Sequence, residues 1–505
     1  MTPSVGTLPL IARARRSHGD RVAIVDAAGK HTYRELLEAS AAAAACFLAG
    51  RIDLAEMRVA YFVPPGFAHV AIQWGIWRAG GVAVPLALSH PAAELSYVIR
   101  DSEAAIVVAD PVYADALRPL AESAGARFVT TTRALAARHW SLPEVAEARR
   151  AMMVYTSGTT GKPKGVVTTH ANIRAQIESL VDEWEWTADD RTLLVLPLHH
   201  VHGIVNVVAC ALWAGAGCKM LPRFDAGETW ASIETSRLTV FMAVPTIYGR
   251  LIAAWDAAPA ERRVDMTKGC RRMRLMVSGS AALPVHTLER WREISGHTLL
   301  ERYGMTEIGM ALSNPLHGER RPGHVGTPLP GVEARLVDEA GAPVAPGTQG
   351  EIEIRGPNVF LEYWRRPEAT QEAFRDGWFR TGDTAVVEDG SYRILGRTSV
   401  DIIKTGGFKV SALEIEEELR THPAVAECAV VGVPDPDWGE RVSVAVELAA
   451  GAELDLDALQ AWARERLAPY KVPRALRCVS ALPRNAMGKV LKPEVAKLFG
   501  SAAPS

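Results

Sequence analysis

The chain has 505 residues, 48% of them hydrophobic and 23% charged, and a formal net charge of −2. This length exceeds what one compact core supports, so we expect two or more domains in a protein of ordinary globular composition. The near-neutral charge gives no sign of nucleic-acid or anionic-membrane binding, because both would call for a strongly basic surface. Small molecules are therefore the expected partners.

Six cysteines are scattered along the chain without a CxxC pair or zinc-ligand spacing. We expect reduced core thiols and a cytoplasmic location. The basic residues near the N-terminus are not followed by a long apolar segment, so we expect neither a signal peptide nor a membrane anchor.

The first 150 residues alternate between predicted helices and strands. Thr32, with Glu35 three positions later, forms a capping-box pattern that opens a predicted helix over 32–50. Further apolar runs predict three strands and one helix, at 59–63, 81–85, 105–109 and 68–79. This order predicts an α/β fold with a mostly parallel sheet covered by helices on both faces.

A polar segment then follows the apolar run 152–155. It consists of Thr156, Ser157, Gly158, Thr159, Thr160, Gly161, Lys162, Pro163 and Lys164. Glycine flexibility, hydroxyl donors and positive charge together suit a polyphosphate. The segment differs from the common nucleotide-binding P-loop, which has four residues between its glycines and a Ser or Thr after its lysine. The alternative is a polar surface turn.

Three predicted strands, at 193–197, 239–244 and 275–277, end in segments that carry candidate site residues. Ligands bind beyond the carboxyl ends of strands in open α/β sheets, so these segments should face one cleft. The first strand leads to His199, His200 and His202, and the third to Gly279, Ser280 and Ala281. Adjacent histidines on an extended segment point to opposite faces, and no carboxylate or cysteine lies at ligand spacing, so we predict no metal site there.

From about residue 325 the pattern changes to short strands broken by glycine and proline, at 332–337, 350–355 and 392–395. These predict a small antiparallel β subdomain over about 325–397. Beyond it we expect a compact α+β domain. Its predicted helices are 410–420 and 456–467, and its predicted strands are 427–433 and 442–448. The predicted division is thus an N-terminal domain over 1–397 and a C-terminal domain over 398–505.

Taken together, these segments resemble the adenylate-forming superfamily of acyl-CoA synthetases, peptide-synthetase adenylation domains and luciferases. The segment 156–164 matches its signature loop, and 301–307 matches its YGxTE motif. Residues 379–383 and 483–489 match its ribose-binding and C-terminal lysine motifs. The resemblance covers about residues 20–498 in the family's order. It implies a large N-terminal domain of helix-covered, mostly parallel sheets with a small β subdomain, joined by a hinge to a small mobile C-terminal domain.

The resemblance also implies ATP and magnesium as ligands. Segment 156–164 would hold the β- and γ-phosphates, Lys489 would lie at the α-phosphate, and Glu307 would bind Mg²⁺ with Thr306 nearby. The remaining implied nucleotide contacts are Gly279, Ser280, Ala281, Tyr303, Gly304, Asp383 and Arg397. Positive groups around the phosphates fit the chemistry, because in-line attack at phosphorus depends on geometry and charge neutralisation.

In acyl-CoA synthetases the C-terminal domain rotates between two half-reactions. The resemblance places the hinge within 398–401 and implies that rotation withdraws Lys489 and presents Gly406 and Gly407 to the tunnel for coenzyme A. Acylation of Lys489 by a lysine acyltransferase, reversed by a deacylase, would remove the charge that the first half-reaction needs.

The substrate expectation depends on two arginines. The segments 196–203, 301–307 and 396–404 most resemble malonyl-CoA synthetases, in which an arginine that pairs with the distal carboxylate matches Arg237. His200 and His202 fall at acyl-pocket positions, and Arg302 replaces a glycine that leaves room for large apolar acyl groups in many relatives. A buried guanidinium binds a carboxylate and rejects an apolar acid. We therefore expect malonate or methylmalonate, the alternative being salt bridges of these arginines to acids such as Glu234 or Glu301.

Other functions stay open at this point. One is a short- or medium-chain fatty acyl-CoA synthetase, and another is a stand-alone adenylating enzyme that loads a carrier protein. No carrier-attachment motif follows residue 500, which favours coenzyme A as the acceptor. A catalytically inactive binder is disfavoured because both Glu307 and Lys489 are present. A monomer and a homodimer are equally compatible with the sequence.

Overall fold

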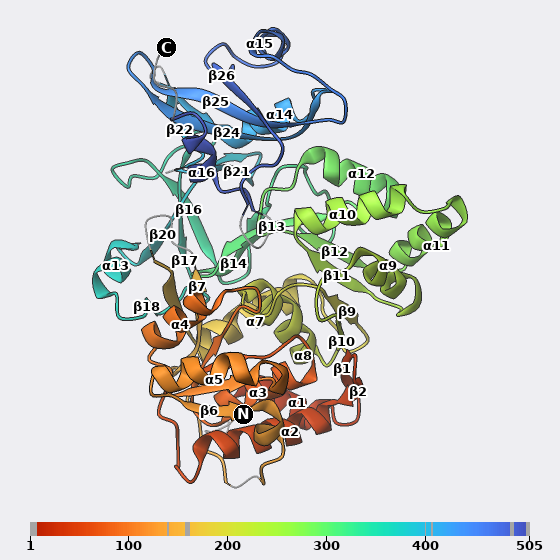
Figure 1. The fold of residues 1–505 in the computed structure, drawn as a ribbon, viewed down its shortest axis with the longest axis vertical. Coiled ribbons are helices and arrows are strands. Elements are labelled where there is room, and N and C mark those ends of the chain that lie inside the picture. Colours follow the sequence, from red (N-terminus) through yellow and green to blue (C-terminus); the bar gives the residue numbers. More distant parts are fainter. Residues whose placement is uncertain are drawn as a thin grey trace.

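The structure is a computed structural model that describes residues 8–138, 141–156, 162–398, 400–405, 408–484 and 489–500. Within these residues the strands form four sheets. Figure 1 shows the N-terminal sheets and helices in the lower part of the molecule and the C-terminal strands at the top. None of the helices in the described ranges is long and apolar enough to cross a membrane.

The first sheet has the strand order β18-β8-β7-β4-β3-β5-β6. Pairing is parallel from β7 to β6 and antiparallel where β8 and β18 extend one edge. Its strands are β3 (Arg58–Phe62), β4 (Val82–Pro85), β5 (Ile106–Ala109), β6 (Arg127–Thr130), β7 (Arg150–Thr156), β8 (Lys164–Thr169) and β18 (Glu362–Tyr363). The predicted alternation and parallel sheet are therefore confirmed.

Helices cover both faces of this sheet because alternate strand residues point to opposite sides. Phe62 and Val84 pack with helices α4 and α5, whereas Tyr61 and Ala83 belong to the main core with α2 and α3. These helices are α2 (Tyr33–Leu48), α3 (Phe67–Arg78), α4 (Ala92–Asp101) and α5 (Ala114–Ser123). The short α6 (Thr131–Leu135) contacts α2 and α3.

The predicted capping box at the start of α2 is confirmed. The Thr32 amide donates to Glu35 Oε2 over 2.6 Å, and the Glu35 amide donates to Thr32 Oγ1 over 3.2 Å. The helix ends at Ala49, which adopts the left-handed conformation with a φ of 47°. The chain then turns through Gly50.

The second sheet has the order β15-β14-β13-β12-β11-β9-β10-β1-β2. Its six strands from β13 to β1 pair in parallel, and both edges are antiparallel. Its strands are β1 (Val22–Asp26), β2 (Gly29–Thr32), β9 (Arg191–Leu194), β10 (Gly217–Met220), β11 (Val240–Ala243), β12 (Leu275–Ser278), β13 (Leu300–Met305), β14 (Gly309–Ser313) and β15 (Thr327–Pro328).

One helical layer lies between the two sheets. Helix α7 (His170–Glu183) contacts both β7 and β14, and α3 contacts both β4 and β1. Two further helices, α1 (Pro9–Ser17) and α8 (Cys210–Ala214), join this layer through contacts with each other and with α2 and α7. A group packed against β12 forms the outer face: α9 (Ala226–Thr235), α10 (Pro245–Asp256), α11 (Ala260–Arg271) and α12 (Val285–Ser295).

The predicted antiparallel β subdomain is confirmed, and one short strand leaves it. Every pairing in the third sheet is antiparallel. Its strands are β16 (Glu333–Val337), β17 (Gly350–Arg355), β19 (Phe374–Arg375), β20 (Trp378–Glu388) and β21 (Ser391–Arg397). Between β17 and β19 the chain passes through β18, which pairs with β8 of the first sheet, and α13 (Pro367–Glu372).

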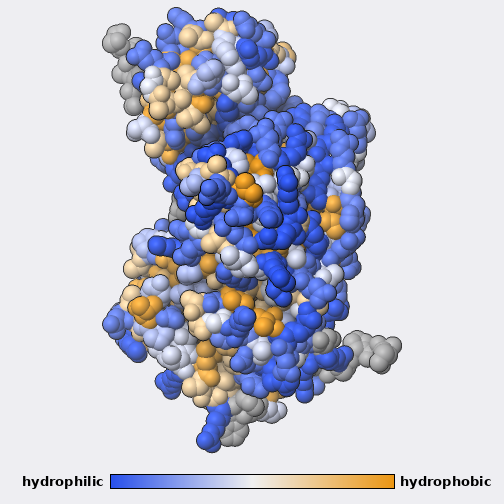
Figure 2. Space-filling view, turned by 90° about the vertical axis from the view of Figure 1, so that its right-hand side faces the viewer, coloured by the Kyte–Doolittle hydropathy of each residue, from blue (hydrophilic) through white to orange (hydrophobic). Residues whose placement is uncertain are grey.

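The C-terminal part forms an α+β unit whose sheet has the order β23-β22-β25-β24, with β26 on β25. Its elements are β22 (Ile402–Thr405), β23 (Phe408–Ser411), α14 (Ala412–Leu419), β24 (Val425–Asp435), β25 (Gly439–Leu448), α15 (Leu456–Arg464), β26 (Ala475–Val479) and α16 (Lys492–Lys497). In Figure 2 this unit is the upper lobe, set off from the body by an indentation.

One predicted boundary in this unit is wrong. The expected helix over 410–420 begins only at Ala412, because Val410 and Ser411 pair with β22 as part of β23. Ser411 then caps the helix, since its Oγ accepts from the Glu414 amide over 3.2 Å. The strands β22 and β26 were not predicted, because their short polar-interrupted sequences carry little period-2 signal.

Candidate active site

The predicted phosphate segment begins and ends on β7 and β8, two antiparallel strands that form a β-hairpin. Thr156 at the end of β7 pairs with Lys164 at the start of β8. Ser157, Gly158, Thr159, Thr160 and Gly161 lie outside the described residues. On the outgoing arm, Lys164 Nζ lies 5.1 Å from the centre of the Tyr363 ring, a cation–π distance. Lys162 Nζ lies 5.8 Å from the ring of Tyr97.

Glu307 lies beside the base of this hairpin. Tyr363 donates its hydroxyl to Glu307 Oε1 over 2.9 Å, so one tyrosine contacts both Lys164 and the predicted magnesium ligand. The Glu307 carbonyl accepts from the Phe360 amide over 2.7 Å. Burial raises the pKa of the Glu307 carboxyl, and the hydrogen bond from Tyr363 opposes this effect. Thr306 immediately follows β13 and is half-buried. The structure thus brings the hairpin base and the carboxylate together.

Tyr303, Asp383 and Arg397 form the predicted nucleoside cluster. Tyr303 donates to Asp383 Oδ2 over 2.5 Å, and Arg397 Nε lies 3.1 Å from Asp383 Oδ1. Asp383 and Arg397 are paired residues on β20 and β21. Burial raises the pKa of Asp383, while the positive charges of Arg397 and Lys489 act in the opposite direction. Lys489 is therefore close enough to Asp383 for its charge to act on this cluster.

Gly304 lies within the same strand as Tyr303, where β13 and β14 approach closely. A Cβ at Gly304 would lie 2.0 Å from the Gly309 carbonyl oxygen. No larger residue fits at Gly304 without moving the backbone of the β13–β14 pair. The glycine of the YGxTE motif is thus required by packing.

Gly279, Ser280 and Ala281 follow β12 at the carboxyl edge of the second sheet. Ser280 adopts a φ of 68°, and its Oγ lies 3.1 Å from His202 Nδ1. Ser280 and Ala281 are exposed, whereas Gly279 is buried. This segment and the histidine segment therefore meet at one edge of the sheet, as predicted.

The histidines are not on an extended segment, and this part of the prediction is wrong. Strand β9 ends at Leu194, and His202 begins a wide helical segment, η2 (His202–Ala209). The rings of His199 and His200 lie 4.1 Å apart, on the same side of the chain. Burial lowers the pKa of His199 to about 2 and that of His200 to about 4, so both rings are neutral near pH 7. No group of three or more potential ligand side chains is arranged for a metal ion within the described ranges.

Arg302 is a buried cation that no anion neutralises among the described residues. Its exposed fraction is 5%, and its Nε and Nη2 have no hydrogen-bond partner there. Burial lowers its pKa to about 9, which still leaves it charged near pH 7. The pKa of His202 is lowered mainly by burial and further by the positive charge of Arg302. A Cβ on Gly279 would lie 2.5 Å from its Cζ, so the guanidinium occupies the space that this glycine leaves.

The alternative explanation for Arg302, a salt bridge to a neighbouring acid, does not hold. Glu301 points to the opposite side of the strand, where its Oε1 accepts from the Gly323 amide over 3.0 Å. Glu234 lies 3.6 Å from Arg262 instead. A buried guanidinium with unsatisfied donors is costly, so the site suits a carboxylate ligand.

The expectation for Arg237 is contradicted. Arg237 is exposed, adopts a φ of 52° and precedes β11 at its amino end. The cluster around Arg302 lies at the carboxyl ends of the parallel strands β12 and β13, at the other edge of the sheet. Nearness to a strand in the sequence does not tell which edge of the sheet a residue occupies. Residues just before a parallel strand lie at one edge, and residues just after it lie at the other.

Two contributing tyrosines were missed. Tyr363 lies in the short strand β18, and no motif in the sequence singles it out. Tyr248, on α10, donates to the Val277 carbonyl over 2.9 Å behind the Arg302 site. Its position three residues after Pro245, just beyond the end of β11, was the available signal. Gly406 and Gly407 lie outside the described residues.

Comparisons with known proteins give matches over most of the chain. The family described as AMP-binding enzyme matches residues 11–364, and the AMP-binding enzyme C-terminal domain matches 414–489. The mitochondrial malonate–CoA ligase of Mus musculus is 50% identical, covering 97% of this chain and 91% of the relative. The malonate–CoA ligase of Arabidopsis thaliana is 44% identical, covering 88% and 78%. The ATP-bound structure of MatB from Rhodopseudomonas palustris is 38% identical with a TM-score of 0.90, covering 98% and 99%.

Proposed function

Because the chain belongs to the AMP-binding enzyme family, we propose that it is an AMP-forming acid–thiol ligase that joins malonate or methylmalonate to coenzyme A. The reaction consumes ATP and passes through an acyl-adenylate. Relatives named malonate–CoA ligases, which are 44–50% identical, support the substrate. The observation that carries the proposal is the buried guanidinium of Arg302 beside Gly279, whose Nε and Nη2 have no partner among the described residues.

Arg302 gives a physical reason for selecting a dicarboxylate. One carboxylate of malonate reacts, and the other can accept hydrogen bonds from Nε and Nη2 of Arg302, which have no partner in the part of the chain that the structure describes. An apolar acid in the same pocket would leave the cation desolvated and unpaired. Leaving a buried charge unpaired costs about 3–5 kcal/mol, or roughly a hundredfold or more in specificity.

In the first half-reaction a carboxylate oxygen attacks the α-phosphorus of ATP, and the bond from that phosphorus to the pyrophosphate oxygen breaks. Lys489 would offset the negative charge of the α-phosphate. Lys162 and Lys164, on the hairpin, would offset the negative charge of the β- and γ-phosphates. Asp383, already positioned by Tyr303 and Arg397, would accept hydrogen bonds from the ribose hydroxyls.

Magnesium fits the residues around Glu307. Mg²⁺ in nucleotide sites is bound by one or two carboxylates and completed by phosphates and water. Glu307 offers one such carboxylate, oriented by Tyr363, with the Thr306 hydroxyl next in the chain. The bound ion would supply charge neutralisation for the phosphates.

In the second half-reaction the thiol of coenzyme A loses its proton to solvent and its sulfur attacks the acyl carbonyl carbon. The bond from that carbon to the phosphate oxygen breaks, and AMP leaves. Rotation about the segment 398–401 would withdraw Lys489 from the α-phosphate position. The two half-reactions would thus depend on different residues of the C-terminal domain.

AMP release with ATP, Mg²⁺ and coenzyme A tests the proposal across malonate, methylmalonate, acetate, butyrate and benzoate. We expect kcat/KM for malonate to exceed that for butyrate by roughly a hundredfold. Equal or better turnover of butyrate would indicate a short- or medium-chain fatty acyl-CoA synthetase. Product formation only with a phosphopantetheinylated carrier protein would indicate a carrier-loading enzyme.

A further inference from the structure

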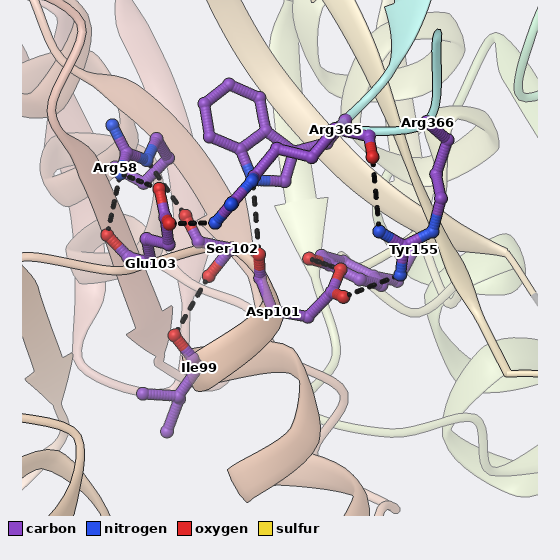
Figure 3. Close-up of polar contacts among 9 residues, drawn as sticks. Arg58, Ile99, Asp101, Ser102, Glu103, Tyr155, Arg365 and Arg366 are labelled. Atoms are coloured by element: carbon purple, nitrogen blue, oxygen red, sulfur yellow. Dashed lines mark hydrogen bonds and ion pairs between the residues drawn. The ribbon is translucent and has the colours of Figure 1, made fainter. Parts of the chain in front are cut away.

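A second polar cluster lies beside the hairpin, centred on Asp101, the last residue of α4 (Figure 3). Its carboxylate side chain has an exposed fraction of 14%. Tyr155 donates to Asp101 Oδ2 over 2.8 Å, and Arg366 Nη2 donates to Oδ1 over 3.0 Å. The Asp101 carbonyl accepts from Trp364 Nε1 over 3.1 Å. One residue thus holds three side chains from two distant parts of the chain.

The contact with Tyr155 reaches the incoming arm of the hairpin, since Tyr155 immediately precedes Thr156. The outgoing arm is held from the same helix. Tyr97, four residues before Asp101 and therefore on the same helical face, donates to the Pro163 carbonyl over 2.8 Å. Helix α4 thus fixes Tyr155, just before the predicted phosphate segment, and Pro163, near the end of that segment.

The contacts of Asp101 with Trp364 and Arg366 involve the chain segment that supports Glu307. These residues follow Tyr363, which donates to the Glu307 carboxylate. Arg58 secures the same region: its guanidinium lies 4.8 Å from the centre of the Trp364 ring, and its Nε donates to the Ser102 carbonyl over 2.8 Å. The segment carrying Tyr363 is therefore fastened to the end of α4.

We propose that Asp101 is a positioning residue for the phosphate half of the nucleotide site, acting through Tyr155 and Arg366. The inference depends on the proposed function, because it assigns the hairpin and Glu307 to ATP. Asp101 bonds both to Tyr155 on the hairpin and to Arg366 in the segment that carries Tyr363, so it sets the distance between these two segments. Small displacements of groups around a reacting phosphate lower rates steeply. Pyrophosphate has left before the second half-reaction, so Asp101 should matter only in the first.

Three single variants, one double variant and one control separate positioning from general stability. Asp101→Asn removes the charge, Tyr155→Phe removes one hydrogen bond while keeping the ring, and Asp101→Glu tests rescue. The control is Glu94→Gln on the same helix, whose Oε2 lies 3.3 Å from His90 Nδ1 and which contacts neither hairpin arm among the described residues. ATP affinity by titration calorimetry, both half-reactions and thermal midpoints are measured on the full chain.

We expect Asp101→Asn and Tyr155→Phe to weaken ATP binding and raise the KM for ATP by about tenfold or more, the range for lost hydrogen bonds to charged groups. The KM for the carboxylate and thioester formation from supplied acyl-adenylate should stay within about twofold of wild type. The double variant should lose less than the product of the two single losses, because both remove the same contact. Asp101→Glu should recover part of the ATP affinity.

Equal losses in both half-reactions, or the same KM shift in Glu94→Gln, would overturn the proposal and assign a structural role. Tyr155→Phe keeps the test valid if Asp101→Asn fails to fold, since unchanged ATP affinity in a folded Tyr155→Phe protein would also overturn it. ATP titration needs no carboxylate. A wild-type protein that binds ATP and activates no dicarboxylate would refute the proposed function while the ATP affinities still decide the role of Asp101.

Discussion

The Nζ of Lys492 lies 2.6 Å from Asp401 Oδ1, and it also lies 2.7 Å from Glu416 Oε1. Asp401 Oδ2 accepts from the Arg397 amide over 2.9 Å, at the end of β21. Lys492 begins α16, three residues after Lys489. This ion pair therefore ties the segment that carries the predicted catalytic lysine to the segment that follows the nucleotide-contacting arginine.

We expect Lys492→Met to destabilise the C-terminal unit by about 3–5 kcal/mol, because it removes the cation that lies between two largely buried carboxylates. Urea unfolding of the full chain, with hydrogen exchange read over residues 400–500, measures this. Lys497→Met in the same helix is the control: it removes an exposed ion pair with Glu494 and should cost less than about 1 kcal/mol. Equal effects of the two variants would contradict the role of Lys492.

Substitution of Arg302 should change substrate choice. In Arg302→Met we expect kcat/KM for malonate to fall by roughly a hundredfold while ATP affinity is kept, because the distal carboxylate loses its partner. The exposed Arg237→Ala variant is the matched control and should retain the wild-type preference. Competition assays with malonate and butyrate measure the preference. A larger effect from Arg237 would restore the expectation that the structure contradicts.

Gly279→Ala should alter the same preference without unfolding the protein. Its Cβ would lie 2.5 Å from the Arg302 Cζ, and the long arginine side chain would have to shift. A misplacement of about 1 Å costs on the order of a hundredfold in rate. Gly249→Ala on α10, where a Cβ meets no atom within 4 Å, is the control. Malonate turnover unchanged by Gly279→Ala would argue against a fixed position of the guanidinium.

Lys489→Ala should abolish acyl-adenylate formation and leave thioester formation from supplied acyl-adenylate largely intact. The reason is that only the first half-reaction needs a positive charge at the α-phosphate. Pyrophosphate exchange and thioester formation measure the two steps separately, and equal loss in both would refute this division. We further propose that acylation of Lys489 has the same effect, which acetylated protein with full adenylation activity would disprove.

Glu301 should make stability depend on pH. Burial raises its pKa from 4.5 to about 8, so the native state binds the proton more tightly than the unfolded chain. The stabilisation is complete below about pH 4.5 and is lost as pH rises to about 8. Glu301→Gln, which stays neutral, should remove this loss, on the order of a few kcal/mol between pH 5 and 8.5. Urea unfolding at both pH values measures it, and the exposed Glu289→Gln should track wild type.

The sequence by itself determined the local elements and the family. Strand and helix periodicity predicted the parallel sheets, Thr32 and Glu35 predicted a helix start that the structure reproduces, and the ordered motifs predicted the family. These signals lie within short windows, where the repeat of apolar residues and the chemistry of caps act directly.

Only the tertiary structure decided which charged groups face the site. Arg237 and Arg302 each stand next to or within a strand, yet one lies exposed at the amino edge and the other buried against Gly279 at the carboxyl edge. Asp101 meets Arg366 across 265 residues, and Tyr363 reaches Glu307 across 56. Such contacts depend on which strands pair and in what register. Residues that are distant in the sequence set the burial and the electrostatic environment of a side chain. A local sequence pattern therefore does not predict them.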